Sequence, residues 1–293
     1  MMSPIIYNLA RALGAACCVL AGLDAAPPRA TAPTRITVLA RGFGQPDDLA
    51  WGPHGSIYFT DFGNAALNLL LPDGSRRQVV GNLPAPEGIV VLPDGLLIVA
   101  EQKSNRLLLV DPAHHSLRTL VTIPNPSARA GIDGIALDPR DGSIIVPDSP
   151  SGRVLRVSVA GALGHATPAA SLHVTRIAIL AQGFGRPVDA LVRANGEIIV
   201  ADESLNGVFS IDTHGALHRV GGFFSVPDDL VDDGHGGFYV SCLGDNTVRH
   251  VDSHGTATRG TAAAPYPQGL LRRADGTLIV AEENANRIVS VRP

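Results

Sequence analysis

The sequence predicts an all-β protein, a six-bladed β-propeller, and three observations lead to this prediction. One pattern of Pro or Ile, a short apolar run, a turn glycine and a second apolar run occurs six times. The copies begin at Pro46, Pro86, Ile132, Pro187, Pro227 and Pro267. Their spacing of roughly 40 to 50 residues is typical of propeller blades. The apolar runs are short, rich in Val, Ile and Leu, and bounded by Gly, Pro, Asp and Asn, which indicates buried strands rather than helices.

We expect each blade to be a four-stranded antiparallel sheet, although the last copy supplies only three strands before Val291. The segment from Ile36 to Ala40 is an apolar strand that belongs to no blade. We therefore predict that this N-terminal strand completes the last blade and closes the ring, which removes two open sheet edges. The sequence RITVLARGFGQP from Arg35 is similar to RIAILAQGFGRP from Arg176, which indicates that the ring arose by duplication of three blades.

Residues 1–30 differ in character from residues 31–293, which we expect to form a single propeller domain. An uncharged apolar run from Ala12 to Leu23 follows Arg11 and precedes small residues, a pattern typical of a secretory signal peptide. The run is shorter than the roughly 20 apolar residues that a membrane-spanning helix needs, so we expect no membrane span. We expect a secreted or periplasmic protein, with a disordered N-terminus as the alternative. Without this segment Cys242 is the only cysteine, so no internal disulfide is expected.

The charge of the chain argues against some classes of partner. The net charge is −4, and Lys and Arg form no cluster. Nucleic acid and anionic membrane surfaces are therefore not expected partners. The sequence gives no indication of the oligomeric state.

Acidic residues recur directly after the blade-opening Pro, where the innermost strands of a propeller surround its channel. The first position holds Asp47, Glu87, Asp133, Val188, Asp228 and Gln268, and the second holds Asp48, Gly88, Gly134, Asp189, Asp229 and Gly269. Carboxylates this close raise one another's pKa or bind a cation. Their hard oxygen atoms favour Ca²⁺, with Mg²⁺, Mn²⁺ or Zn²⁺ as alternatives. The structural alternative is that each acid binds backbone N–H groups of its own turn.

A second series of acids follows the middle strand of the blades. Its members are Asp61, Glu101, Asp148, Asp202 and Glu282, with Cys242 in place of an acid in the fifth copy, and most have an Asn or Gly four residues later. We expect these acids to hold their own loops. Cys242 is either a reactive thiol or a buried small residue, and we expect the second because the repeat places no histidine to activate it. The sequence contains no G-x-S-x-G, H-E-x-x-H, C-x-x-C or P-loop motif.

The repeated pattern P-x-G-[IL]…D-G-x-[IL]-x-V-A-[DE]…N-R-[IL], clearest from Pro86 and from Pro267, resembles NHL and gluconolactonase-type propellers. The stretch VPDDLVDDGHGGFYVSCLGDNTVRHVD from Val226 is similar to a segment of the senescence-marker-protein/gluconolactonase family. The resemblance implies a channel cation held by a Glu, an Asn and an Asp. Asp228 matches that Asp, whereas Asp47 stands at the Glu position and Val188, beside Asp189, at the Asn position.

The leading hypothesis is a divalent-metal-dependent hydrolase of a lactone or related cyclic ester bound at the channel mouth. In this hypothesis Asp47, Asp189 and Asp228 bind the cation, and Glu87 or Asp133 orients water. One alternative is a non-catalytic NHL-like propeller that recognises a ligand or protein with its channel face. Another is a metal-dependent lyase or isomerase, because one fold supports several chemistries.

Overall fold

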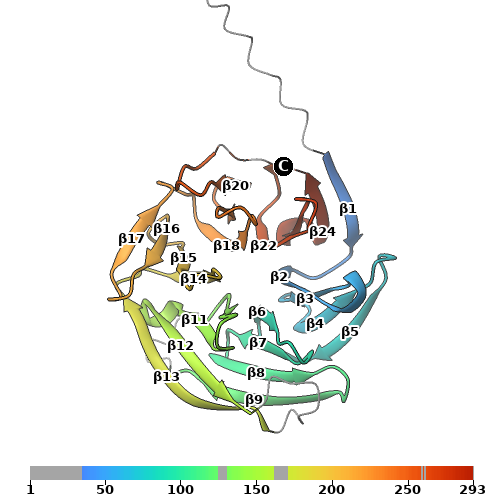
Figure 1. Ribbon diagram of the computed structural model, residues 1–293. Coiled ribbons are helices and arrows are strands. Elements are labelled where there is room, and N and C mark those ends of the chain that lie inside the picture. Colours follow the sequence, from blue (N-terminus) through green and yellow to red (C-terminus); the bar gives the residue numbers. More distant parts are fainter. Residues whose placement is uncertain (1–34, 125–130, 162–170, 259, 261, 293) are drawn as a thin grey trace, which may run out of the picture. The chain divides into compact units, whose positions relative to one another are not determined.

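Six four-stranded antiparallel sheets surround a central axis in the computed structural model, which describes residues 35–124, 131–161, 171–258, 260 and 262–292 (Figure 1). The predicted six-bladed propeller is therefore confirmed. The predicted signal peptide, residues 1–30, lies outside the described residues. Within the described ranges, no helix has the length and apolar character needed to cross a bilayer.

The first three blades are each built from four consecutive strands. Blade 1 contains β2 (Pro46–Trp51), β3 (Ile57–Asp61), β4 (Ala66–Leu70) and β5 (Arg76–Gly81), with the short 3-10 helix η1 (Pro53–Gly55) in its first turn. Blade 2 contains β6 (Pro86–Val91), β7 (Leu97–Glu101), β8 (Arg106–Asp111) and β9 (Ser116–Thr122). Blade 3 contains β10 (Ala136–Leu137), β11 (Ile144–Asp148), β12 (Arg153–Ala160) and β13 (His173–Gln182), with η2 (Ser149–Ser151) after β11.

The next two blades repeat this order, and the last blade combines the first strand of the described chain with its last three strands. Blade 4 contains β14 (Pro187–Val192), β15 (Ile198–Asp202), β16 (Gly207–Ile211) and β17 (Leu217–Val220). Blade 5 contains β18 (Pro227–Asp232), β19 (Phe238–Cys242), β20 (Thr247–Val251) and β21 (Ala262–Ala263). Blade 6 contains β22 (Pro267–Arg272), β23 (Leu278–Glu282), β24 (Arg287–Arg292) and β1 (Arg35–Arg41), with η4 (Glu283–Ala285) after β23.

The closure of the ring by β1 is confirmed. β1 pairs antiparallel with β24, so that Ile36 lies opposite Val291 and Val38 lies opposite Val289. The N-terminal strand is the outermost strand of blade 6 (Figure 1). Blade 6 thus consists of strands from both ends of the described chain.

The hydrophobic core lies between the blades rather than at the centre of the ring. Six clusters of buried side chains form, one between each pair of neighbouring blades. Between blades 2 and 3, for example, Ile98 and Leu109 pack with Ile144 and Leu155. Because both faces of each blade are covered, the middle strands are apolar without alternation, and all five residues of β7 and of β23 are buried.

The start of the innermost strand is irregular in five blades, and this irregularity positions the channel acids. In β2, β6, β18 and β22 the register shifts within the first four residues, and β14 shifts within its first three. A bulge sets extra residues against its partner strand and redirects side chains. The side chains of the two residues after each opening Pro are therefore directed to two different places in the channel.

Candidate functional site

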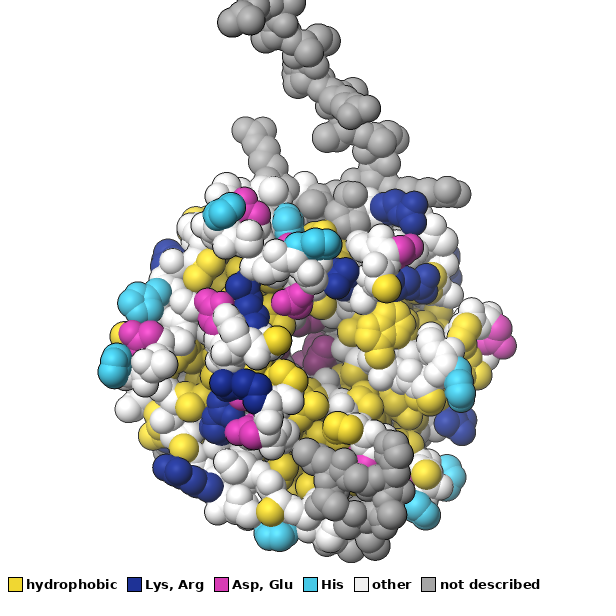
Figure 2. Space-filling model, viewed as in Figure 1, with side chains coloured by type: hydrophobic (Ala, Val, Ile, Leu, Met, Phe, Trp, Pro, Cys, Tyr) yellow, Lys and Arg dark blue, Asp and Glu magenta, His cyan; other side chains and the backbone are white. Residues whose placement is uncertain are grey.

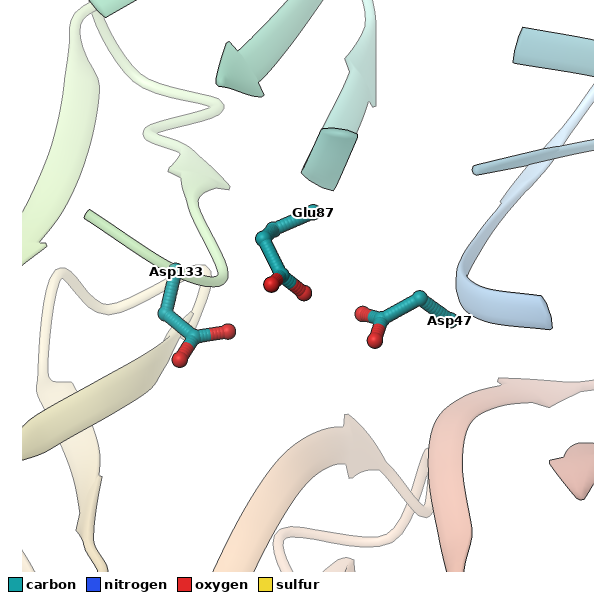
Figure 3. A group of neighbouring side chains, drawn as sticks. All are labelled: Asp47, Glu87 and Asp133. Carbon is teal, nitrogen blue, oxygen red and sulfur yellow. The ribbon is translucent and has the colours of Figure 1, made fainter. Parts of the chain in front are cut away.

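The first position after the opening Pro brings three carboxylates together at the channel mouth. Asp47 comes from β2, Glu87 from β6, and Asp133 from the segment just before β10. One carboxylate oxygen from each residue lies within 4.8 Å of the other two, and Figure 3 shows the three groups pointing toward one another. We call these residues the acidic triad. Such a buried set of oxygen donors could bind a metal ion.

The environment of the triad disfavours the ionised form of its carboxyl groups. Burial raises the pKa of Asp47 well above its ordinary value, and the charge of Asp133 raises it further. Burial likewise raises the pKa of Glu87, with the charge of Asp47 as the next cause. Like charges in a low-dielectric site repel, so that the site holds protons or attracts a cation. A divalent ion would remove this penalty.

Arg186 is the one basic side chain that lines the pocket at the channel mouth, within the described part of the chain. Its guanidinium lies 2.9 Å from a carboxylate oxygen of Asp133 and also pairs with Glu203. Burial raises the pKa of Asp133 to about 6, although the nearby Arg186 opposes the shift. Asp133 is therefore the triad member with the smallest penalty for ionisation.

Asp228 adds a fourth carboxylate from β18. Only 9% of its surface is exposed, and it lines the same pocket as the triad. Burial raises the pKa of Asp228 well above its usual range, followed by the charges of Asp133 and Asp47. Within the described residues, its carboxylate has no hydrogen-bond partner. A buried carboxylate without a fixed partner is free to act on a ligand or on water.

The acids and Arg186 open into a pocket of about 200 Å³, here called the mouth pocket. Its wall combines polar and apolar groups. Its other lining residues are Phe62, Gln102, Glu203, Leu243, Tyr266, Gln268 and Glu283. Most of the lining residues are polar or charged, so the pocket suits a small ligand with several hydrogen-bonding groups.

The second position after the Pro has a structural role that the sequence analysis did not assign to it. Asp48 accepts a hydrogen bond from the backbone N–H of Ile89 in the next blade, at 2.8 Å. Asp189 accepts one from Leu230 at 3.0 Å, and Asp229 accepts one from Leu270. We call Asp48, Asp189 and Asp229 the interblade acids.

Glycines occupy the second position in the other three blades, where the innermost strands come too close for a side chain. A Cβ on Gly88, for example, would lie 2.6 Å from the backbone nitrogen of Ile135.

Asp189, which we expected to bind the cation, faces the innermost strand of blade 5 because it accepts the hydrogen bond from Leu230. It still lines a narrow part of the channel together with Asp47, Asp133 and Asp228. Figure 2 shows acidic side chains inside the central hollow.

The interblade acids are buried together, and their pKa values reflect it. Burial raises the pKa of Asp189 to about 8, although a hydrogen bond with Asp229 opposes the shift. Burial also raises the pKa of Asp229 well above its usual value, with the charge of Asp189 as the next cause. At least one of these carboxyl groups is therefore protonated near neutral pH.

Two acids of the second series hold their own loops, as predicted. Asp61 accepts a hydrogen bond from the backbone N–H of Asn64 at 3.2 Å, and Asp202 accepts one from Leu205 at 2.8 Å. Both also accept hydrogen bonds from the loop that precedes their blade. Three other members pair instead with an arginine of the next strand: Glu101 with Arg106, Asp148 with Arg153, and Glu282 with Arg287. Cys242 is a buried residue of the core between blades 4 and 5, and burial raises the pKa of its thiol to about 12. The expectation of a structural rather than reactive cysteine is confirmed.

Arg186 and Glu203 are the site residues that the sequence analysis missed. Arg186 directly precedes the opening Pro187. None of the other five copies has a basic residue at this position, where Gln45, Ala85, Gly131, Val226 and Tyr266 stand. An alignment of the six copies could therefore have identified Arg186, because only one copy places a basic residue beside the channel acids.

No protein-family model and no curated protein matches the sequence, but solved structures share the fold. A gluconolactonase from Xanthomonas campestris is 14% identical, with a TM-score of 0.69, and the match covers 88% of this chain and 89% of that one. A gluconolactonase candidate has 16% identity, a TM-score of 0.69 and coverage of 89% and 93%. Virginiamycin B lyase from Staphylococcus aureus has 16% identity, a TM-score of 0.64 and coverage of 89% and 88%. At these identities the likeness shows the fold, a six-bladed propeller structurally similar to both kinds of protein.

Proposed function

We propose that this protein is a divalent-metal-dependent hydrolase that opens a lactone or a related cyclic ester in the mouth pocket. The observation that supports this most directly is the acidic triad, whose buried carboxylate oxygens lie within 4.8 Å of one another. The fold shared with gluconolactonases makes lactones the first substrate class to test.

Each acid has a role in this proposal. Asp47, Glu87 and Asp133 hold the cation, for which an all-oxygen set favours Ca²⁺ over softer metals. When bound, such an ion polarises the ester carbonyl. Asp228 lines the pocket beside the triad and has no hydrogen-bond partner among the described residues. Its ionised carboxylate accepts a proton from the attacking water and returns this proton to the ring oxygen as the acyl C–O bond breaks. Arg186 keeps Asp133 oriented through their 2.9 Å contact.

This assignment differs from the one made on the sequence, in which Asp228, Asp189 and Asp47 bind the cation. The variant Asp228→Asn separates the two. If Asp228 is the base, the variant keeps its metal and loses about 10²- to 10⁴-fold in kcat. If Asp228 is a ligand, the variant loses the metal.

The experiment measures metal content by mass spectrometry and hydrolysis of a panel of sugar and alkyl lactones. The control is Asp73→Asn, which removes one carboxylate from an exposed turn and should match the wild type in both measurements. Wild-type protein without a stoichiometric divalent metal, under conditions where Ca²⁺ is supplied, would overturn the proposal.

A second candidate function is a non-catalytic binding propeller, and one observation favours it. Arg186 already neutralises Asp133 and bridges it to Glu203. A fixed cation beside the triad weakens the demand for a metal. In this case the wild type binds a small ligand at the mouth pocket and hydrolyses none of the lactones, and Arg186→Gln weakens that binding.

A further inference from the structure

A second pocket lies between blades 5 and 6, on the face opposite the channel mouth. It is bordered by the turn from β18 to β19 and the turn from β22 to β23, and its volume is about 360 Å³. Its lining residues are Asp233, His235, Tyr239, His250, Arg272, Ala274, Asp275 and Gly276. We call it the groove pocket. It shares no residue with the mouth pocket.

Arg272 is a partly buried guanidinium without an acidic partner. Its side chain donates only to backbone carbonyl oxygens, at 2.8 Å to Asp232 and 3.4 Å to Arg273. Across the described ranges of the chain it forms no ion pair. These carbonyl contacts orient the guanidinium without neutralising its charge, and an Arg positioned in this way is suited to bind a carboxylate or phosphate.

The arginine is not explained by the architecture of the blade. Arg272 is the last residue of its innermost strand and lies opposite Leu278. The residues at the same register in blades 1 to 4 are Trp51, Val91, Leu137 and Val192. Four blades thus use an apolar residue where blade 6 places a cation.

His250 is a second polar side chain of the pocket, and one of its two ring nitrogens makes no hydrogen bond within the described residues. Its Nε2 lies 2.7 Å from the Oδ2 atom of Asp233, whose Oδ1 is held by the N–H groups of His235 and Gly237 at 2.7 and 2.8 Å. Because Asp233 accepts, Nε2 carries the hydrogen. The other ring nitrogen, Nδ1, has no partner among the described residues.

Tyr239 holds the imidazole of His250 in place. The two rings lie 4.7 Å apart at an angle of 35°. Burial raises the pKa of Tyr239, with the charge of Asp233 as the next cause, so the phenol keeps its proton and can donate a hydrogen bond. In the described structure this hydroxyl also has no hydrogen-bond partner.

The carboxylates of the groove pocket already have partners. Asp233 accepts a hydrogen bond from His250, and Asp275 lies 3.2 Å from Arg292. The guanidinium of Arg272, in contrast, has no ion-pair partner among the described residues. In blade 3 the acid that corresponds to Asp233 is Asp138, which two arginines hold, so the acid–base pair alone is structural and Arg272 is what distinguishes this pocket.

We propose that the groove pocket binds an anionic group, a carboxylate or a phosphate, through the guanidinium of Arg272 and the hydroxyl of Tyr239. The pocket does not depend on the metal or on the hydrolase proposed for the mouth pocket.

The test titrates the full-length chain with inorganic phosphate and, separately, with acetate, at constant ionic strength so that screening does not change. Binding is followed by nuclear magnetic resonance shifts of the backbone amides. The matched pair of variants is Arg272→Met and Arg273→Met, since Arg273 is an exposed neighbour in the same turn and does not line the pocket. Circular dichroism checks that both variants fold.

Saturable shifts at the groove pocket are expected for the wild type and for Arg273→Met. In Arg272→Met the affinity should fall about tenfold or more, because a charge-assisted hydrogen bond is lost. The arm that saturates at the lower concentration identifies phosphate or carboxylate as the preferred group. If Arg272→Met does not fold, Tyr239→Phe takes its place and should weaken binding while it keeps the ring contact with His250.

Two results would overturn the proposal. One is a wild type whose amides show no saturable shift with either anion. The other is an equal response of the wild type and both arginine variants, which would indicate only general attraction to a charged surface.

Discussion

The interblade acids predict that the metal-free protein becomes less stable as pH rises from 5 to 7. Asp189 has a pKa raised to about 8 in the folded protein, chiefly by burial, against about 3.9 in an unfolded chain. The folded state therefore keeps a proton that the unfolded state releases. Stability from this group is complete below pH 4 and is lost as pH rises toward 8.

The size of the effect follows from one retained proton. Each pH unit between the two pKa values changes the free energy of unfolding by about 1.4 kcal/mol per proton. Counting only one shared proton for Asp189 and Asp229, the loss from pH 5 to pH 7 is about 3 kcal/mol. For a domain of this size that corresponds to a fall in Tm of about 6 to 12 °C.

Thermal unfolding in the presence of a chelator, at pH 5, 6 and 7, measures this slope. Asp189→Asn keeps a carbonyl oxygen for the N–H of Leu230 but cannot titrate, so its slope should be flatter by about one proton. Asp73→Asn, in an exposed turn, should keep the wild-type slope. A Tm of the chelated wild type that rises between pH 5 and pH 7 would refute the reasoning.

Three further predictions concern the metal, the core and the thiol. At one fixed calcium concentration, chosen as about 100 times the Kd at pH 7, calcium should add about 3 kcal/mol to the free energy of unfolding at pH 7. The gain should be smaller at pH 5, where protons compete with calcium for the carboxylates. Glu87→Gln should abolish the gain in a thermal-shift assay, and an unchanged gain would exclude the triad as the site. Ile98→Ala, in the core between blades 2 and 3, should cost about 2 to 5 kcal/mol in urea unfolding, whereas a cost below 1 kcal/mol would contradict the packing described. Cys242, whose thiol pKa is raised to about 12 by burial, should resist iodoacetamide at pH 8 in the folded protein, and rapid labelling detected by mass spectrometry would show that it is accessible.

The sequence was sufficient for the blades and for the ring closure because both depend on repetition. The spacing of Pro and the turn glycine places each innermost strand, and the unpaired strand near Ile36 has one available partner, β24. The position of the acids at the channel mouth follows from the same register.

The different roles of neighbouring acids could not be predicted from the sequence. Asp47 and Asp48 are adjacent, yet one faces the triad and the other the N–H of Ile89. The bulge at the start of β2 sets the directions of these two side chains. No residue pattern in the sequence predicts this bulge. For the same reason the sequence grouped Asp189 with Asp228, although Asp189 accepts a hydrogen bond from Leu230 of the next blade and Asp228 has no hydrogen-bond partner among the described residues. The contact between Arg186 and Asp133 links two blades through a long side chain, whose direction the repeat does not determine.

The pairing of β1 with β24 also sets the order of events when the chain is synthesised. Blades 1 to 5 can each form as their own residues leave the ribosome, but β1 has to wait for the last strand. At about 5 to 20 residues per second, that wait is roughly 10 to 50 s. During this time β1 offers an open strand edge of the kind that promotes aggregation. A nascent chain that stalls before Arg287 would retain that exposed edge, and a quality-control chaperone could recognise it there.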